Sequence, residues 1–139
     1  MAERYVLDTS AILALLGDEP GAERVERLLR GARAGRHGLL VCSITLMELF
    51  YTALRARGED VAVRLVALVK AWPVEWAYPD EKVLLQAGRL KAFYRLSVAD
   101  ALIAAVAKMQ PAILVHKDPE LDALKGQVDV LSLSAKGKR

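Results

Sequence analysis

The feature that most constrains the fold is an alternation of short apolar runs with longer amphipathic segments along the chain. Runs of three or four apolar residues are typical of buried strands, whereas apolar residues spaced three and four apart are typical of helices. Strands that alternate with helices indicate an α/β domain with a mostly parallel sheet. We therefore expect strands at residues 5–7, 39–42, 74–76, 113–115 and 128–131.

The segments between these strands are expected to be helical. Ser10 and Ser97 stand where they can cap helices that follow them, and either Ser43 or Thr45 can cap another helix that ends at Gly58. No repeat or linker marks a second domain, so residues 1–139 are expected to form one domain of ordinary size. The other helices are predicted at residues 11–16, 22–33, 59–71, 81–94, 98–108 and, as a short turn, 119–125.

Composition narrows the class of protein. An apolar fraction of 54% supplies material for a core, and the single cysteine, Cys42, excludes a disulfide framework and favours a small core residue in a reducing compartment. No signal peptide or apolar segment of about 20 residues is visible, so we expect a soluble, cytoplasmic protein. A net charge of +3 does not identify a nucleic-acid binder by itself. An arginine recurs every third residue from Arg24 to Arg36, and this pattern fits either a solvated helix face or a phosphate-contacting surface.

Four acidic residues occupy unusual positions. Asp8 and Asp118 follow predicted strands, and ligand sites of parallel sheets lie at the carboxyl ends of the strands. Glu48 and Asp100 lie early in helices among apolar neighbours, where an unpaired carboxylate must be paired, protonated or bound to a cation. Converging carboxylates repel one another, and a hard divalent cation such as Mg²⁺ or Mn²⁺ relieves that repulsion.

Three of these residues also have an ordinary structural explanation. Asp8 could be a helix cap or a turn residue, and Asp100 could complement the dipole of its helix. Glu48 stands three residues after Thr45, as the glutamate of a capping box does. The hypothesis that all four acids are ordinary structural residues is much weaker than that of one shared site.

The motifs around these four acids resemble those of PIN domains. Residues 5–11 are similar to the opening strand of that family, a hydrophobic run ending in an aspartate followed by hydroxyl residues. Residues 43–49 resemble the helix that supplies a glutamate, and residues 96–105 resemble the segment in which aspartate precedes Ala-Leu-Ile-Ala-Ala. Residues 113–119 are similar to the strand that leads to the fourth acid. The four motifs occur in order and span almost the whole chain, and its size resembles the VapC-type toxins of VapBC toxin–antitoxin systems.

This resemblance implies a three-layer α/β/α sandwich with a mostly parallel sheet of four to five strands, formed by a single PIN domain at 1–139. It implies a metal-dependent endoribonuclease in which Asp8, Glu48, Asp100 and Asp118 hold one or two Mg²⁺ or Mn²⁺ ions. It also implies an RNA substrate, a cognate antitoxin protein and a homodimer. Residues 22–29 and 45–54 are candidate interaction surfaces.

Two positions depart from the family pattern. His116 stands where threonine or serine is usual, and it could reach the metal, a phosphate or Asp118, or simply be solvated. Leu121 stands where phenylalanine is frequent. Asp122 is the alternative fourth acid if Asp118 points away.

Other functions remain open at this stage. A haloacid-dehalogenase phosphatase needs a second acid where this chain has Ser10, and a receiver domain needs an early acidic pair that is absent. A PIN-domain ribonuclease of RNA processing and a non-catalytic scaffold that binds RNA or protein remain alternatives. Basic side chains around the pocket are expected to grip RNA, with Thr9 or Ser10 bonding a carboxylate or phosphate. Trp72 and Trp76 could stack on bases, although packing is the stronger interpretation.

Overall fold

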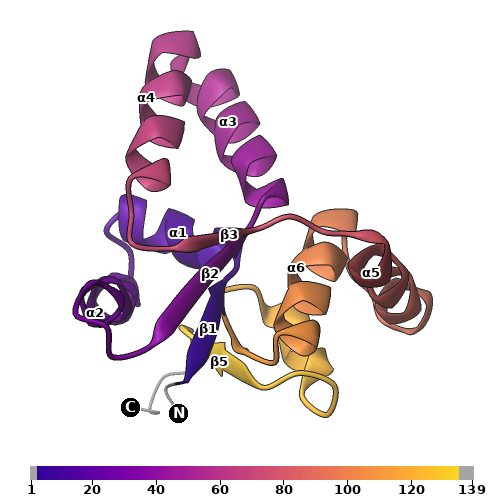
Figure 1. The fold of residues 1–139 in the computed structure, drawn as a ribbon. Helices are drawn as coiled ribbons and strands as arrows, with labels where there is room; N and C mark the ends of the chain where they lie inside the picture. Colours follow the sequence, from indigo (N-terminus) through magenta and orange to yellow (C-terminus); the bar gives the residue numbers. More distant parts are fainter. Residues whose placement is uncertain (1–2, 135–139) are drawn as a thin grey trace.

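A computed structural model describes residues 3–134 and shows a five-stranded parallel sheet with helices on both faces (Figure 1). The strand order is β3-β2-β1-β4-β5, so β1 and β4 are neighbours at the centre. This arrangement confirms the predicted α/β class and the parallel sheet. The strands are β1 (Arg4–Leu7), β2 (Gly38–Cys42), β3 (Glu75–Ala77), β4 (Ile113–His116) and β5 (Val130–Ser132).

The helices follow the predicted order along the chain, and most begin or end within a few residues of the expected positions. They are α1 (Thr9–Leu16), α2 (Ala22–Arg33), α3 (Ile44–Arg57), α4 (Glu59–Lys70), α5 (Glu81–Phe93), α6 (Val98–Met109) and the 3-10 helix η1 (Pro119–Leu124).

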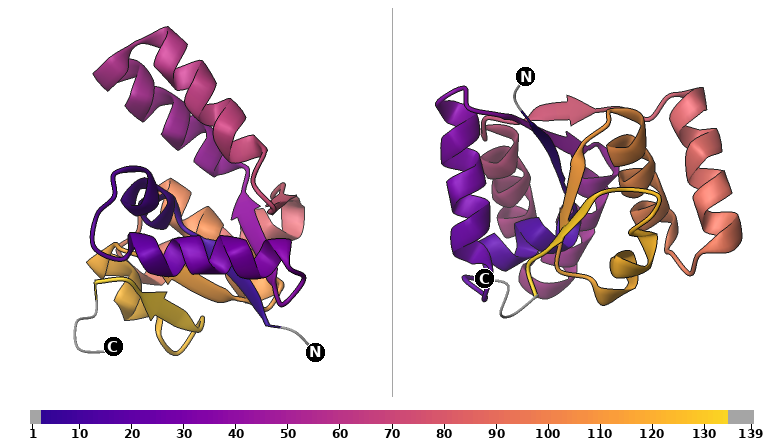
Figure 2. Two further views of the ribbon diagram at one scale, coloured as in Figure 1. Left: turned by 90° about the vertical axis from the view of Figure 1, so that its left-hand side faces the viewer. Right: turned by 90° about the horizontal axis from the view of Figure 1, so that it is seen from below.

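Successive residues of the central strands pack into two separate cores because side chains alternate across a sheet. Val6 of β1 packs with α5, α6 and η1 on one face, whereas Leu7 packs with α1 and α2 on the other. Leu114 and Val115 of β4 divide between the same two cores. Both faces of the sheet are covered (Figure 2), which explains why these strands are continuous apolar runs rather than alternating ones.

Helices α3 and α4 form a hairpin that projects away from the sheet (Figures 1 and 2). Leu49 and Val69 are fully buried where the hairpin meets the second core. The hairpin also leaves several large apolar side chains exposed. They are Met47, Tyr51, Leu54, Val63 and Leu68. Of the two candidate interaction surfaces, the one in α3 therefore exposes apolar groups, whereas Ala22 and Val25 of α2 are buried in the core.

The start of α1 differs from the prediction. The helix begins at Thr9, and Asp8 is its N-cap because the Asp8 side chain accepts the backbone N–H of Ser10. Ser10 lies inside the first turn and is not the cap. The apolar periodicity identified the helix but gave no information on whether Asp8 or Ser10 caps it.

The last strand also differs, since β5 covers Val130–Ser132 rather than residues 128–131. The N–H of Val128 bonds Leu124 O and closes a turn, and Val128 packs in the first core. Val128 is buried as a strand residue would be, although it lies in this turn. Pairing with β4 begins only at Val130, opposite Leu114.

Several side chains are placed as predicted. Cys42 is buried and free, and burial raises the pKa of its thiol. Trp72 and Trp76 pack against the second core, with Lys70 Nζ 5.2 Å from the centre of the Trp76 ring. Across residues 3–134, the helices are all too short or too polar to cross a membrane.

Candidate active site

The four predicted acids come together in one pocket. Asp8 follows β1, Asp118 follows β4, Glu48 lies in α3 and Asp100 lies in the first turn of α6, and all four line this pocket. The pocket lies at the carboxyl edge of the sheet because β1 and β4 are adjacent and parallel. The convergence is what the sequence predicts; the role of each residue stays a prediction.

Asp8 is the most buried member, with 2% of its surface exposed. Its Oδ2 accepts the Ser10 N–H at 3.0 Å and the Ser10 hydroxyl at 2.5 Å. Its Oδ1 is buried and has no hydrogen-bond partner among the described residues. A buried carboxylate oxygen without a partner is costly, so this atom is available to a ligand that enters the pocket.

Ser10 connects Asp8 to the loop after β4. Its hydroxyl oxygen accepts the backbone N–H of Lys117 at 2.8 Å while it donates to Asp8. The loop that carries Asp118 is thus tied to the carboxylate of Asp8 through one serine. This assigns Ser10 to a carboxylate contact, one of the two roles that the sequence left open.

Glu48 is held by a chain of hydroxyl groups. Thr9 Oγ1 donates to Glu48 Oε1 at 2.5 Å and lies 2.9 Å from Thr45 Oγ1, which is fully buried. The interpretation of Glu48 as a capping-box residue is wrong, because Ser43 precedes α3 and the Glu48 carboxylate bonds Thr9 instead. Burial and, to a smaller extent, the charge of Asp8 raise the pKa of Glu48, and the bond from Thr9 lowers it.

Asp100 has the most perturbed ionisation in the pocket. Burial raises its pKa to about 8, and the nearby Asp8 and Asp118 add to this by repelling its charge and favouring its proton. Its backbone N–H bonds the Ser97 hydroxyl at 3.0 Å, so Ser97 caps α6 as predicted. A pKa of about 8 favours the protonated form of Asp100 at neutral pH.

Asp118 faces the pocket from the start of η1. Its Oδ1 accepts the N–H of Glu120 at 3.1 Å, which caps that turn. The alternative fourth acid, Asp122, lines a different pocket, and its Oδ1 lies 3.2 Å from His116 Nε2. His116 is fully buried, so the hypothesis of a solvated histidine is wrong. Leu121 is also fully buried, where it fills the first core.

The pocket walls contain residues that the motifs did not identify. Tyr51 and Thr52 follow Glu48 by three and four positions on α3, a spacing that places them on the same helix face. Glu120 of η1, two residues after Asp118, also lines the pocket. Helical spacing from Glu48 was the signal that could have found the first two.

Basic side chains are absent from this lining within residues 3–134. Lys117 lies next to Asp118 in sequence, but its Nζ pairs with Glu19 at 3.2 Å. The prediction that basic side chains around the pocket contact RNA therefore concerns residues outside this lining, and it stays a prediction.

The donor set fits a hard divalent cation. Within the described part of the chain, no three His, Cys, Asp or Glu side chains are already arranged as a metal site. The pocket nevertheless offers only oxygen donors, which Mg²⁺ and Mn²⁺ prefer. The unpartnered Oδ1 of Asp8 and the raised pKa of Asp100 both indicate that the carboxylates of the pocket lack a positive charge to balance them.

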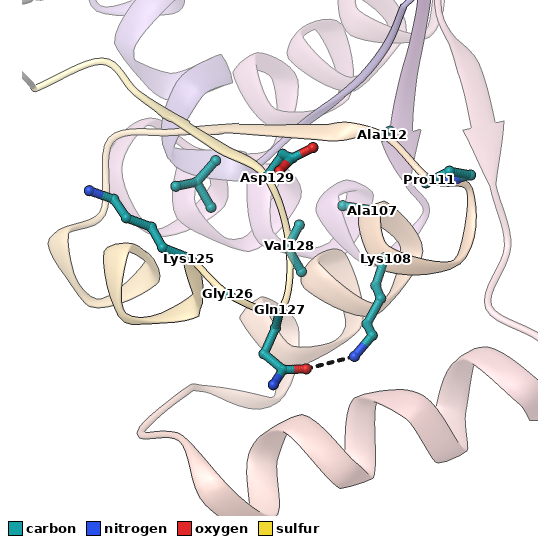
Figure 3. A pocket seen from close by; sticks show the side chains of 10 residues that line it. Ala107, Lys108, Pro111, Ala112, Lys125, Gly126, Gln127, Val128 and Asp129 are labelled. Carbon is teal, nitrogen blue, oxygen red and sulfur yellow. Dashed lines mark hydrogen bonds between the residues drawn. The ribbon is translucent and has the colours of Figure 1, made fainter.

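A separate pocket lies at the amino ends of β4 and β5, the opposite edge of the sheet (Figure 3). Lys108 crosses it to donate to Gln127 Oε1 at 2.6 Å, and Asp129 is its only acidic side chain. This pocket brings together none of the four predicted acids.

Comparison with known proteins agrees with the geometry. VapBC-1 from nontypeable Haemophilus influenzae is 24% identical, covers 95% of this chain and 99% of its own, and has a TM-score of 0.74. VapBC2 from Rickettsia felis, bound to a promoter DNA fragment, is 18% identical, covers 93% of this chain and 98% of its own, and has a TM-score of 0.73. VapC20 from Mycobacterium tuberculosis, described as a sarcin-ricin loop cleaving toxin, is 21% identical, covers 91% of this chain and 98% of its own, and has a TM-score of 0.68. No curated protein matches. The family model of the PIN domain matches residues 5–127, most of the length, and the chain therefore belongs to the PIN-domain family.

Proposed function

We propose that this PIN domain is a Mg²⁺- or Mn²⁺-dependent endoribonuclease and the toxin of a toxin–antitoxin pair. The observation that supports this most is the convergence of four carboxylates from four separate segments, with one oxygen of Asp8 buried and unpartnered. Such a pocket is electrostatically incomplete without a cation. Similarity to solved VapBC toxin structures supports the same conclusion.

In this proposal Asp8, Glu48, Asp100 and Asp118 would hold one or two ions. When bound, Mg²⁺ or Mn²⁺ would supply an activated water at neutral pH and neutralise the charge that develops on the scissile phosphate. Asp8 would offer Oδ1, while Ser10 fixes the orientation of Oδ2. Thr9 holds Glu48 in place, and Asp100 would act as a ligand after losing its proton to solvent.

The pocket wall favours an unpaired RNA segment. Tyr51 is 42% exposed at the rim and offers a ring face on which a base can stack. A base is free to stack in this way only where the RNA is single-stranded or looped. Because the pocket floor is acidic, the phosphate reaches it only through the cation, so binding of RNA and metal should be coupled.

The antitoxin and a second copy of the chain are the proposed protein partners. Several similar structures are toxin–antitoxin complexes. The α3–α4 hairpin exposes the apolar side chains of Met47, Leu54, Val63 and Leu68. Several large apolar side chains exposed on one element are typical of a surface that binds another protein. A protein that covers this hairpin would also lie beside the pocket, since Tyr51 belongs to both.

Cleavage of an RNA panel tests the enzyme. Purified protein is incubated with labelled single-stranded and looped RNAs in EDTA, Mg²⁺ or Mn²⁺. We expect cutting only with metal, and a loss of at least about 100-fold in Asp8→Asn because Oδ1 can no longer serve as an anionic ligand. Asp60→Asn, an exposed carboxylate in the first turn of α4, is the matched control and should cut normally.

Each alternative gives a different result. Cutting that survives both EDTA and Asp8→Asn would refute the carboxylate–metal mechanism. Folded protein that binds Mn²⁺ and cuts none of the RNAs would favour a non-catalytic scaffold. Growth arrest on expression, abolished by Asp8→Asn and relieved by a small open reading frame encoded beside the gene, would separate a toxin from an RNA-processing enzyme.

A further inference from the structure

His116 is a buried polar side chain whose role is not explained by the four acids. It is the last residue of β4 and has no exposed surface. Its Nδ1 accepts the backbone N–H of Asp118 at 3.1 Å, and its Nε2 lies 3.2 Å from Asp122 Oδ1. Neither Nε2 nor this Oδ1 has a well-directed hydrogen bond to any described group, and the contact between them is not aligned as one. The ring thus lies between the end of β4 and Asp122 of η1.

The contact at Nδ1 assigns the tautomer of the ring. A nitrogen that accepts an N–H carries no proton of its own, so a neutral imidazole must carry its proton on Nε2. That proton lies on the edge of the ring beside Asp122, whose Oδ1 is 3.2 Å from Nε2 without being aligned for a hydrogen bond. The two ends of the ring are therefore not interchangeable, because Nδ1 accepts from Asp118 whereas Nε2 lies beside Asp122.

These contacts fix the loop that carries the fourth acid. The N–H of Lys117 bonds Ser10, which bonds Asp8, and the next N–H, that of Asp118, bonds His116. Two consecutive backbone groups are thus tied, one toward Asp8 and the other to the imidazole. Rotation of this loop would break both ties, so the position of Asp118 relative to Asp8 depends on them.

We propose that His116 is a positioning residue that places the Asp118 carboxylate beside Asp8 by accepting the Asp118 N–H at Nδ1, in the tautomer that this contact requires. This inference rests on the proposed metal-dependent function. Groups of this kind, which orient a metal ligand without touching the metal, commonly change metal affinity or activity by about 10- to 100-fold when they are removed. His116 itself is not proposed to touch metal or RNA.

Two substitutions separate the two ends of the ring. In His116→Asn the side-chain oxygen can take the place of Nδ1 and still accept the Asp118 N–H, but it does not reach Asp122. In His116→Gln the amide extends toward the place of Nε2, and no acceptor occupies the place of Nδ1. His116→Leu fills the volume and accepts at neither end.

Binding of Mn²⁺ alone, measured by calorimetry, is compared in these variants together with kcat and KM on a cleaved RNA. We expect His116→Gln and His116→Leu to lose about 10- to 100-fold in Mn²⁺ affinity and in kcat with KM for RNA nearly unchanged. His116→Asn should stay within about threefold of the wild type while losing as much thermal stability as His116→Gln. Equal Mn²⁺ affinity of the Asn and Gln variants, whether both are normal or both are weak, would overturn the proposal.

The tautomer gives a test that needs no variant. A long-range ¹H–¹⁵N correlation spectrum of the metal-free wild type should show His116 protonated on Nε2 and unprotonated on Nδ1. A proton on Nδ1 would overturn the proposal even if all variants failed to fold. Wild-type protein that shows the expected tautomer but binds no Mn²⁺ would instead refute the proposed function and leave the placement of the ring intact.

Discussion

Replacing Asp100 by asparagine is expected to stabilise the metal-free protein at high pH. The folded pKa of Asp100 lies above its ordinary value, so the folded state binds this proton more tightly than the unfolded chain does. The stability that comes from this proton is complete below the ordinary pKa of 3.8 and is lost as the pH rises to about 8. Asparagine stays neutral throughout and removes this loss.

The size of the effect follows from the two pKa values. An ordinary pKa of 3.8 and a folded pKa of about 8 set an upper limit of about 6 kcal/mol on the free energy of unfolding. Asp100 is only partly buried, and screening by solvent reduces this to about 2 kcal/mol. Loss of a carboxylate from the first turn of α6 offsets about 0.5 kcal/mol. We expect Asp100→Asn to gain about 1.5 kcal/mol near pH 8.5 and little near pH 4.

Urea unfolding in EDTA at several pH values measures this difference. The gain of Asp100→Asn over the wild type should grow steadily with pH, and Asp60→Asn should show no such trend. Adding Mn²⁺ at pH 8.5 should reverse the ranking, because the wild type gains more stability from the ion. An Asp100→Asn protein that is less stable than the wild type at pH 8.5 in EDTA would refute the reasoning that burial and the neighbouring acids destabilise the charged form of Asp100.

The structure makes three further predictions. Thr9→Val removes the bond to Glu48, so Mn²⁺ affinity should fall about 10-fold by calorimetry while the fold is retained; unchanged affinity would show that the hydroxyl does not orient the carboxylate. Tyr51→Ala should weaken RNA binding by about 1–3 kcal/mol in fluorescence anisotropy without changing Mn²⁺ affinity. Tyr78 is exposed and outside the pocket, so Tyr78→Ala should bind RNA normally, and equal losses of RNA binding in the two variants would exclude stacking at the pocket rim. Ile103→Ala leaves a cavity in the first core and should lower the free energy of unfolding by about 2–5 kcal/mol in urea; a loss below about 1 kcal/mol would indicate a loosely packed core.

The general fold was predictable because each local pattern agrees with the final structure. Leu39 to Cys42 is apolar on both faces, and the structure covers both faces of that strand. The acids were predictable for the opposite reason, since ionisable residues such as Glu48 and Asp100 stand where the surrounding apolar pattern predicts burial. A conflict between a residue and its apolar context is the signal that points to a site.

Side-chain partners were not predictable to the same degree. Thr45 stands three residues before Glu48, as in a capping box, yet the Glu48 carboxylate bonds Thr9 from another element. Long-range contacts of this kind depend on how α1 and α3 pack, and spacing within one segment carries no such information. The burial of His116 was missed for the same reason, because η1 folds back over it only in three dimensions.

The most direct test of the central claim is the anomalous diffraction of crystals grown with Mn²⁺. The account predicts at least one manganese peak in the pocket, bonded to Asp8 Oδ1 and to at least one of Glu48, Asp100 and Asp118. Loss of that peak in Asp8→Asn crystals would agree with it. A fully occupied manganese bound elsewhere, with all four carboxylates free of metal, would contradict it.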